Sequence, residues 1–167
     1  SAASVTYIVA QFNGVILHPA APEFTQIAVT GDTVTAGAGA KLSALAVCAR
    51  DHGLSGLEFA YGIPGSVGGA VYMNAGAYGG EIKDALVRCT VLTRDHRIET
   101  RPAESLALAY RHSALMDDDA IVLSAEFALT PGNPEQIGAQ MNDYMARRKA
   151  KQPLDLPSAG STFKRPA

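Results

Sequence analysis

The stretch Gly62–Glu81, which reads GIPGSVGGAVYMNAGAYGGE, has the composition of a backbone cradle for an anion. It holds seven of the sixteen glycines of the chain, and its only charged residue is the closing glutamate. Glycine adopts backbone angles that other residues avoid, and it leaves backbone N–H groups uncovered. Such N–H groups bind phosphate well, especially at the start of a helix. A helix itself tolerates so much glycine poorly, so the stretch predicts a binding loop.

A second interpretation of this stretch needs no ligand. A glycine-rich turn followed by a closely packed helix has the same composition, and glycine motifs alone are weak signals. Pro64 fixes one backbone angle and Gly65 can take a positive one, while Gly68 and Gly69 remove side chains from a surface. The residue types leave both interpretations open.

A basic cluster near the C-terminal end is the second chemical feature. It contains six of the fourteen basic residues, with only Asp155 among them: Arg147, Arg148, Lys149, Lys151, Lys164 and Arg165. The cluster suits a small anionic ligand. It also suits a helix end, where cations complement the partial negative charge of the last carbonyl groups.

The composition predicts one globular domain. The chain has 167 residues, of which 47% are hydrophobic and 18% are charged, enough for a core of its own. The net charge of −2 argues against general nucleic-acid binding. There is no apolar run of membrane-spanning length and no basic start of a secretory signal, so we expect a cytoplasmic protein.

The spacing of cysteine and histidine predicts no metal site. Cys48 and Cys89 lack CxxC spacing, and a chain of this length does not need a disulfide, so we expect free thiols. The histidines show neither HxxxH nor HExxH spacing. A P-loop ATPase is excluded because GxxxxGK[ST] does not occur.

The residues before the glycine stretch predict a strand, a hairpin and a helix. Gly14–Ala20 is an apolar run that predicts a strand. Gln26–Thr30 and Thr33–Gly37 are rich in β-branched residues and flank the turn signal Gly31-Asp32. The helix is indicated by apolar residues spaced for one helical face and followed by Gly53: Leu42, Leu45, Ala46 and Ala49.

Gly37-x-Gly39, between this hairpin and helix, resembles the start of a dinucleotide-binding fingerprint. Its third position is Leu42 rather than glycine, and a hairpin rather than a βαβ unit precedes it. A Rossmann site is therefore not predicted.

Strands return after the glycine stretch. Ala85–Thr93 and Ile98–Arg101 predict a second hairpin, and Ile121–Leu129 predicts a further strand. Between them, Ala103–Leu108 predicts a short helix and residues 110–113 (YRHS) a polar turn.

A long helix follows the last strand. Asn133 is its expected cap and Pro134 its first residue, with Gln136 at the capping-box position. Its buried stripe is expected to be Ile137, Met141, Tyr144 and Met145, and Gln152-Pro153 ends it. Strands in hairpins with helices between them predict an α+β domain with a largely antiparallel sheet and flanking helices.

Three stretches in this order resemble one enzyme family: GLSGLEFAYGIPGSVGGAVYMNAGAYGGE, AYRHS and QPLDLPSAGSTFKRP. From about Gly14 to its end, the chain is similar to the central part of the UDP-N-acetylenolpyruvoylglucosamine reductase (MurB) family. YMNAGAYGGE resembles the second subtype of that family. The resemblance implies a PCMH-type FAD-binding fold, with residues 1–152 as the second part of the FAD-binding region. Residues 153–167 would then begin a substrate-binding domain.

The resemblance implies a flavoenzyme of peptidoglycan precursor synthesis, with FAD as cofactor and NADPH as co-substrate. Its reaction is the reduction of UDP-N-acetylglucosamine enolpyruvate to UDP-N-acetylmuramate. Hydride passes from NADPH through the flavin to the enolpyruvyl carbon distal to the ether. Charge then builds up in the substrate as an enolate, which needs a donor to hold it and an acid to protonate carbon. No metal, nucleic-acid or membrane partner is implied.

The resemblance assigns two catalytic residues. Arg111 matches the arginine of a tyrosine-arginine motif, and a guanidinium can hold an enolate carboxylate with two donors. Ser161 matches the serine that protonates carbon. Tyr78 matches a tyrosine near substrate and flavin, Lys151 a lysine that reaches the UDP diphosphate, and Lys164 would assist in substrate binding. Without the resemblance, Arg111 is a surface arginine near a helix end and Ser161 a turn-forming serine.

The implied FAD contacts all lie in the glycine stretch: Ile63, Pro64, Gly65, Ser66, Val67, Gly68, Gly69, Asn74, Gly76 and Ala77. Residues 63–69 would offer backbone amides to the diphosphate and the isoalloxazine edge, and the others would lie along the cofactor. Glu58 and Tyr61 are expected to be structural.

Two other functions stay open, a non-catalytic nucleotide-binding module and another PCMH-type flavin oxidoreductase. Arg111, Ser161 and Tyr78 favour the reductase, because a binding module needs no proton donor. The family's first flavin subdomain and most of its substrate domain would lie outside this chain. We therefore expect the isolated chain not to turn over, since catalysis requires all groups to be placed together.

Overall fold

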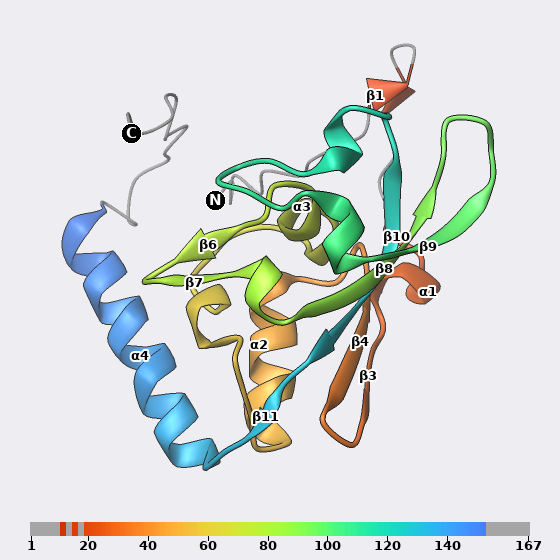
Figure 1. Cartoon of the computed structure of the whole chain (residues 1–167). Coiled ribbons are helices and arrows are strands. Elements are labelled where there is room, and N and C mark those ends of the chain that lie inside the picture. The colour runs from red at the N-terminus through yellow and green to blue at the C-terminus, as the bar shows by residue number, and fades with distance from the viewer. Residues whose placement is uncertain (1–10, 13–14, 17–18, 153–167) are drawn as a thin grey trace.

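A five-stranded antiparallel sheet forms the centre of the computed structural model, which describes residues 11–12, 15–16 and 19–152 (Figure 1). Its strands, in spatial order, are β3 (Ile27–Thr30), β4 (Thr33–Gly37), β10 (Ile121–Ala128), β8 (Leu86–Leu92) and β9 (Ile98–Pro102). Every neighbouring pair is antiparallel. The predicted α+β class with a largely antiparallel sheet is confirmed.

Both predicted hairpins are present. Thr30 pairs with Thr33 across a turn in which Gly31 has a φ of +58°, the left-handed conformation that glycine adopts without strain. Leu92 pairs with Ile98 in the second hairpin. Because β3 and β4 form an antiparallel hairpin rather than part of a βαβ unit, the region lacks the topology of a Rossmann site.

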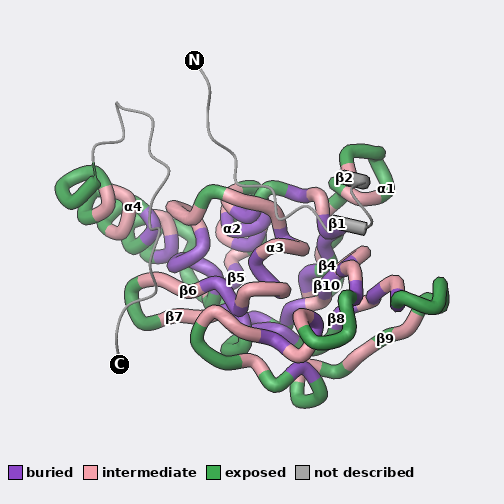
Figure 2. The backbone as a smooth tube through the Cα atoms, turned by 90° about the horizontal axis from the view of Figure 1, so that it is seen from above, coloured by how far each residue is buried: buried purple, intermediate pink, exposed green. Residues whose placement is uncertain are grey.

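The two longer helices also follow the sequence pattern. The helix α2 (Leu42–Asp51) buries the face that was predicted, which consists of Leu42, Leu45, Ala46 and Ala49. The helix α4 (Pro134–Lys151) begins after Asn133, whose side chain accepts hydrogen bonds from the N–H groups of Glu135 and Gln136. It buries Ile137 and Met141. In both views α2 and α3 (Val67–Tyr72) lie between α4 and the sheet (Figures 1 and 2).

The helix α3 corrects the expectation that the glycine stretch is too rich in glycine for a helix. A side chain on Gly68 would place its Cβ 2.8 Å from the Cβ of Ala38, so glycine is needed for the close approach of α3 to the segment after β4. The N–H groups of Val67 and Gly68 donate to the carbonyls of Ala40 and Ala38 at 2.9 and 2.8 Å. The interpretation as close helix packing therefore holds for this part of the stretch.

Shorter elements complete the described chain. They are β1 (Gln11–Phe12), β2 (Val15–Ile16), α1 (Pro22–Thr25), β5 (Leu54–Ser55), β6 (Gly76–Ala77), β7 (Gly80–Glu81) and β11 (Thr130–Pro131), together with 3₁₀ turns at Glu58–Ala60, Ile82–Asp84 and Ala114–Met116. The strand expected over Gly14–Ala20 is thus only Val15–Ile16 where it is described, because Pro19 and Ala20 lie outside it. The helix expected over Ala103–Leu108 is a 3₁₀ turn, Ala103–Leu106, which ends where Ala107 turns left-handed with a φ of +44°.

The glycines of the Gly37-x-Gly39 pattern have a packing role. A Cβ on Gly37 would lie 2.3 Å from the carbonyl oxygen of Phe24, and one on Gly39 would lie 1.8 Å from that of Pro19. The chain before β3 therefore crosses directly over these two residues. This close contact accounts for the two glycines without any nucleotide.

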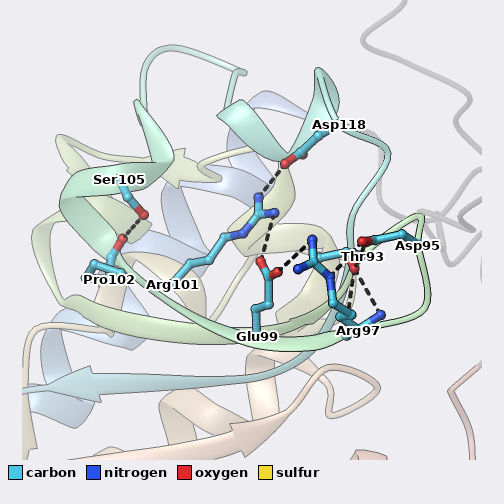
Figure 3. A network of polar contacts seen from close by, with 8 residues as sticks. All are labelled: Thr93, Asp95, Arg97, Glu99, Arg101, Pro102, Ser105 and Asp118. Atoms are coloured by element: carbon cyan, nitrogen blue, oxygen red, sulfur yellow. Dashed lines mark hydrogen bonds and ion pairs between the residues drawn. The ribbon is translucent and has the colours of Figure 1, made fainter.

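Ion pairs cover β9, one of the two edge strands of the sheet (Figure 3). Arg101 donates to Asp118 at 2.6 Å and to Glu99 at 3.5 Å, and Arg97 pairs with Asp95 at 2.6 Å. Charged side chains on an edge strand oppose pairing with another chain. The acids and arginines neutralise one another along this edge.

The described residues include neither a spanning helix nor a metal cluster. Of the helices described, none combines the length and apolar character needed to cross a membrane. Within the same residues, no group of three or more His, Cys, Asp and Glu side chains could hold a metal ion. Cys48 and Cys89 are free thiols, as predicted.

Because the thiol of Cys89 is buried, the unfolding free energy is expected to fall as the pH becomes alkaline. Its thiol is 1% exposed, and burial raises its pKa from 9.0 to about 11. The unfolded chain loses this proton first, so the stabilisation is complete below pH 9 and is lost as pH rises to about 11. Between pH 8 and 11, the unfolding free energy should fall by roughly 2 kcal/mol more in the native sequence than in Cys89→Ala. Urea unfolding measures this, and equal pH dependence in the two proteins would contradict it.

Candidate functional site

The hairpin of β6 and β7 presents Tyr78 at its tip. Ala77 pairs with Gly80, which leaves Tyr78 and Gly79 as a two-residue turn with φ angles of +54° and +88°. This left-handed conformation is strained for tyrosine, and such strain persists only where surrounding contacts hold it. Tyr78 is 39% exposed, which leaves part of its side chain accessible to a ligand.

The ring of Tyr144 on α4 stacks on the ring of Tyr78. The two centroids lie 4.6 Å apart and the planes are 7° from parallel. Arg148, one turn further along α4, donates to the carbonyl of Gly62 at the other end of the glycine stretch. The helix α4 therefore holds this stretch near both of its ends.

The tyrosine stack should contribute measurably to stability. We expect Tyr144→Ala to lower the unfolding free energy by roughly 1–2 kcal/mol, because stacking adds about 0.5–1.5 kcal/mol beyond buried area. Tyr144→Phe, which keeps the stacked ring, should stay within roughly 0.5 kcal/mol of the native value. A double-mutant cycle with Tyr78→Ala measures the coupling. Additive effects of the two alanine substitutions would rule out an energetically significant stack.

Arg111 lies in a second strained turn. Ala109 and His112 exchange two backbone hydrogen bonds of 3.1 Å, which close a tight turn around Tyr110 and Arg111. The φ of Arg111 is +54°. Its Nη2 lies 3.5 Å from the carbonyl oxygen of Gly76 in β6, a long hydrogen bond. The structure thus brings Arg111 to the hairpin that carries Tyr78.

Glu81 lies close to Arg111 but is not suited to donate a proton. The Nζ of Lys83 is 2.9 Å from its carboxylate. This hydrogen bond, with help from Asn74 and the nearby Arg111, lowers the pKa of Glu81 below its usual 4.5. At neutral pH the carboxylate is therefore ionised and has no proton to donate.

The side chain of Asn74 is bound within the protein, which leaves its backbone for the predicted place along the cofactor. Asn74 is 1% exposed. Its Nδ2 donates to Glu81 Oε2 at 2.8 Å and to the Ala109 carbonyl at 3.0 Å, and its Oδ1 accepts from the Lys83 N–H at 3.0 Å. A buried amide with both donor hydrogens in use is not available to a ligand.

The amides of residues 67–69 also differ from the predicted anion cradle. Val67 and Gly68 donate to backbone carbonyls, and the Gly69 N–H donates to the Ser66 hydroxyl at 3.3 Å. These three N–H groups already donate hydrogen bonds that pack and cap α3. All three therefore have partners in this conformation, and their contact with the FAD diphosphate stays a prediction.

The turn before α3 retains the features that a diphosphate needs. The N–H groups of Gly65 and Ser66 donate to no other backbone group within the described chain, and Gly65 has a φ of +148° that favours glycine. Lys41 lies opposite Ser66 in an isolated antiparallel bridge and is exposed. Two backbone donors and a cation suit an anionic cofactor, so Ile63–Ser66 fits the phosphate part of FAD.

The remaining predicted site residues lie in β6, in α4 or outside the described residues. Gly76 and Ala77 form β6 and are half-buried, and a Cβ on Gly76 would lie 2.7 Å from the Cγ of Glu81. Lys151 lies exposed in the last turn of α4, which also contains Arg148 and Lys149. Ser161 and Lys164 lie outside the described residues. The structural role expected for Glu58 agrees with its bonds to Ser55 and Gly56 at 2.6 and 2.9 Å.

Sequence reasoning missed two contributors to the site. Tyr144 was placed in a buried stripe, but its half-buried ring also stacks on Tyr78. Ser113, which is fully buried, donates its hydroxyl to the Tyr72 carbonyl at 2.6 Å. A polar residue gives no local signal of burial, and neither partner is near in the sequence.

The chain is similar to a flavin-binding domain family and to a group of named reductases. Residues 2–100 match the family described as "FAD binding domain". A UDP-N-acetylenolpyruvoylglucosamine reductase from Levilactobacillus brevis is 57% identical over 144 residues, which cover 86% of this chain and 47% of that protein. The resemblance identified from three sequence stretches is confirmed by this similarity.

Solved structures agree with these sequence matches. The crystal structure of the corresponding MurB reductase from Thermus caldophilus has a TM-score of 0.75 and 37% identity, covering 87% of this chain and 52% of that chain. A glucooligosaccharide oxidase from Acremonium strictum, at 23% identity and a TM-score of 0.51, covers 65% of this chain and 24% of that chain and shares the fold alone. The chain spans about half the length of the curated relatives it matches.

Proposed function

Because this chain belongs to the FAD binding domain family, we propose that it is the central part of an FAD-dependent, NADPH-using UDP-N-acetylmuramate dehydrogenase. The reaction is the reduction of UDP-N-acetylglucosamine enolpyruvate in peptidoglycan precursor synthesis. One observation carries the proposal beyond the family match. Two strained turns bring Arg111 and the Tyr78 hairpin together, with Arg111 Nη2 3.5 Å from the Gly76 carbonyl.

Strain of this kind is expected where a side chain must be presented to a ligand. Arg111 at the tip of its turn supplies a permanent positive charge and up to five N–H donors. In the proposed reaction its guanidinium binds the substrate carboxylate, where it stabilises the charge that develops on the enolate. Tyr78 lies at the tip of the hairpin that Arg111 contacts, and the stacked ring of Tyr144 holds its ring in place.

When bound, FAD supplies the hydride that it has taken from NADPH. Within this chain, Ile63–Ser66 would hold its phosphate part through the Gly65 and Ser66 N–H groups, with Lys41 beside them. Gly76 and Ala77 would lie along the cofactor through their backbone. Lys151 would reach the UDP diphosphate, whereas Ser161 would protonate carbon with Lys164 nearby.

The wider assignment follows the sequence expectations. Residues 1–152 would belong to the FAD-binding region and residues 153–167 would begin the substrate-binding domain. The enzyme would act in the cytoplasm, with no metal or nucleic acid as partner. A non-catalytic nucleotide module would need no proton donor, so the role assigned to Ser161 favours the enzyme.

Two measurements test the proposal in a full-length protein that carries this chain, or in the L. brevis reductase with this segment exchanged into it. The first is the flavin absorbance band of the purified protein, before and after FAD is added. Gly65→Ala should weaken flavin binding because its φ of +148° disfavours a side chain. Gly31→Ala also places a side chain at a positive φ, but at an exposed hairpin turn, and should leave flavin binding unchanged.

The second measurement is NADPH consumption with UDP-N-acetylglucosamine enolpyruvate as the substrate. We expect turnover that requires both FAD and the enolpyruvyl group. A protein that binds flavin but consumes NADPH at the same rate without this substrate would overturn the reductase and leave another flavin oxidoreductase. A protein that binds no flavin would overturn the cofactor assignment.

A further inference from the structure

We propose that Asn74 and Ser113 are positioning residues that fix the Arg111 turn in its reactive orientation. The inference rests on the proposed function, because a fixed Arg111 matters only if its guanidinium binds the substrate carboxylate. It gives the Asn74 side chain a role within the protein, whereas the sequence placed this residue along the cofactor. Both residues are almost fully buried and polar, and their partners lie far away in the sequence.

Asn74 ties together three segments of the site. It follows α3 with a φ of +42°, a conformation that asparagine adopts more readily than most residues. One Nδ2 hydrogen bond, 3.0 Å long, reaches the carbonyl of Ala109, the residue that opens the Arg111 turn. The other reaches Glu81 at 2.8 Å in β7, a strand of the hairpin that carries Tyr78. The side chain thus fixes the distance between the arginine turn and the tyrosine hairpin.

Ser113 holds the other side of the same turn. It follows His112, the residue that closes the turn, and its hydroxyl donates to the Tyr72 carbonyl at 2.6 Å. Tyr72 is the last residue of α3, two positions before Asn74. The end of α3 therefore holds the Arg111 turn on both sides, at Ala109 and at Ser113.

This arrangement explains how Arg111 keeps a strained backbone. Its own side chain makes one long hydrogen bond of 3.5 Å to the described residues, which is too weak to hold a turn. The buried bonds of Asn74 and Ser113 are the stronger ones. Loss of either should let Arg111 move, and a displacement of about 1 Å can slow a reaction roughly 10²-fold.

Asn74→Asp is the most selective variant. It keeps the shape and the oxygen that accepts from the Lys83 N–H, but it removes both donors and places a second carboxylate against Glu81. The double variant Asn74→Asp/Glu81→Gln restores a hydrogen bond between these two side chains. It does not restore the bond to Ala109, because a carboxylate cannot donate to a carbonyl.

The test measures two half-reactions in the full-length reductase by stopped-flow absorbance. For Asn74→Asp and for the double variant, we expect flavin reduction by NADPH within about 2-fold of the native rate. We expect oxidation of the reduced flavin by the enolpyruvyl substrate to be slower by about 10²-fold. Ser113→Ala should slow the same step by about 10-fold. Ser105→Ala, which removes a hydroxyl bond of 2.7 Å to the exposed Pro102 carbonyl, is the matched control and should change neither step.

Trypsin gives a second measure that does not depend on activity. The peptide bond after Arg111 should be cut about 10-fold faster in Asn74→Asp and Ser113→Ala than in the native protein, as mass spectrometry of early digests would show. Cleavage after Arg97, whose side chain is 69% exposed, should be unchanged and report that the rest of the fold is intact. This readout remains usable if Asn74→Asp accumulates poorly, because Ser113→Ala carries the same expectation.

Three results would overturn the inference. They are a native rate of flavin oxidation in Ser113→Ala and Asn74→Asp, full recovery in the double variant, or slower flavin reduction with unchanged oxidation in Asn74→Asp. The last would return Asn74 to the cofactor. If the native protein itself does not reduce the enolpyruvyl substrate, the proposed function fails instead, and faster cleavage after Arg111 would still support the positioning role.

Discussion

Arg111→Lys in the full-length reductase is expected to slow reduction of the enolpyruvyl group by about 10²–10³-fold and to leave flavin reduction by NADPH unchanged. Lysine keeps the positive charge but loses the planar pair of donors that holds both oxygens of a carboxylate. The turn also places the guanidinium, and a left-handed φ of +54° fixes its direction. The difference between the two half-reactions separates a substrate role from a cofactor role.

The measurement is the rate at which the reduced flavin is reoxidised by substrate, under single-turnover conditions. Arg97→Lys is a suitable control, because Arg97 is exposed and paired with Asp95 and Glu99 within the β8–β9 hairpin. It should be indistinguishable from the native protein. Reoxidation of the Arg111→Lys flavin at the native rate would remove Arg111 from the enolate site.

Ser161→Ala in the full-length reductase is expected to slow product formation about as much as Arg111→Lys slows reduction of the enolpyruvyl group. The step affected is the protonation of carbon. The resemblance makes the Ser161 hydroxyl the acid that protonates carbon, and a positioned general acid contributes roughly 10²–10⁴-fold. NADPH should reduce the flavin at the native rate in this variant, whereas product should form roughly 10³-fold more slowly. The ionised Glu81 of the described chain does not replace this acid, because its pKa lies below 4.5.

Product formation in Ser161→Ala is followed by separating UDP-N-acetylmuramate from substrate after a single turnover. Ser158→Ala, in the same segment three residues earlier, is the matched control and should behave as the native protein. An unchanged rate of product formation in Ser161→Ala would exclude the proton-donor role. A loss of flavin reduction would instead place Ser161 at the cofactor.

Local patterns predicted the larger elements. The β-branched runs around Gly31-Asp32 form β3 and β4, and the apolar residues at helical spacing in 42–49 form the buried face of α2. The cap at Asn133 starts α4. These features succeed because hairpin turns, caps and amphipathic faces depend on neighbouring residues. The antiparallel α+β class follows from them.

The glycine stretch shows where composition is not sufficient. Seven glycines suggested open backbone for a ligand, yet α3 occupies residues 67–72 and uses the amides of Val67 and Gly68 for packing. Close packing and ligand approach both require the absence of a side chain, so they select the same residue type. Only the contact with Ala38 and Ala40 distinguishes between them. The roles given to the site residues remain predictions that the experiments above address.

The sequence by itself determined the sheet-forming hairpins, the two long helices and the resemblance to a flavin-dependent reductase. Each of these depends on neighbouring residues or on motifs that follow one another in a fixed order. Tertiary structure alone decided how the site is held. The bonds of Asn74 to Ala109, of Ser113 to Tyr72 and of Arg148 to Gly62, and the stack of Tyr144 on Tyr78, join residues 35 to 86 positions apart. Such contacts leave no local pattern, since a buried polar side chain finds its partner only when distant segments are packed together.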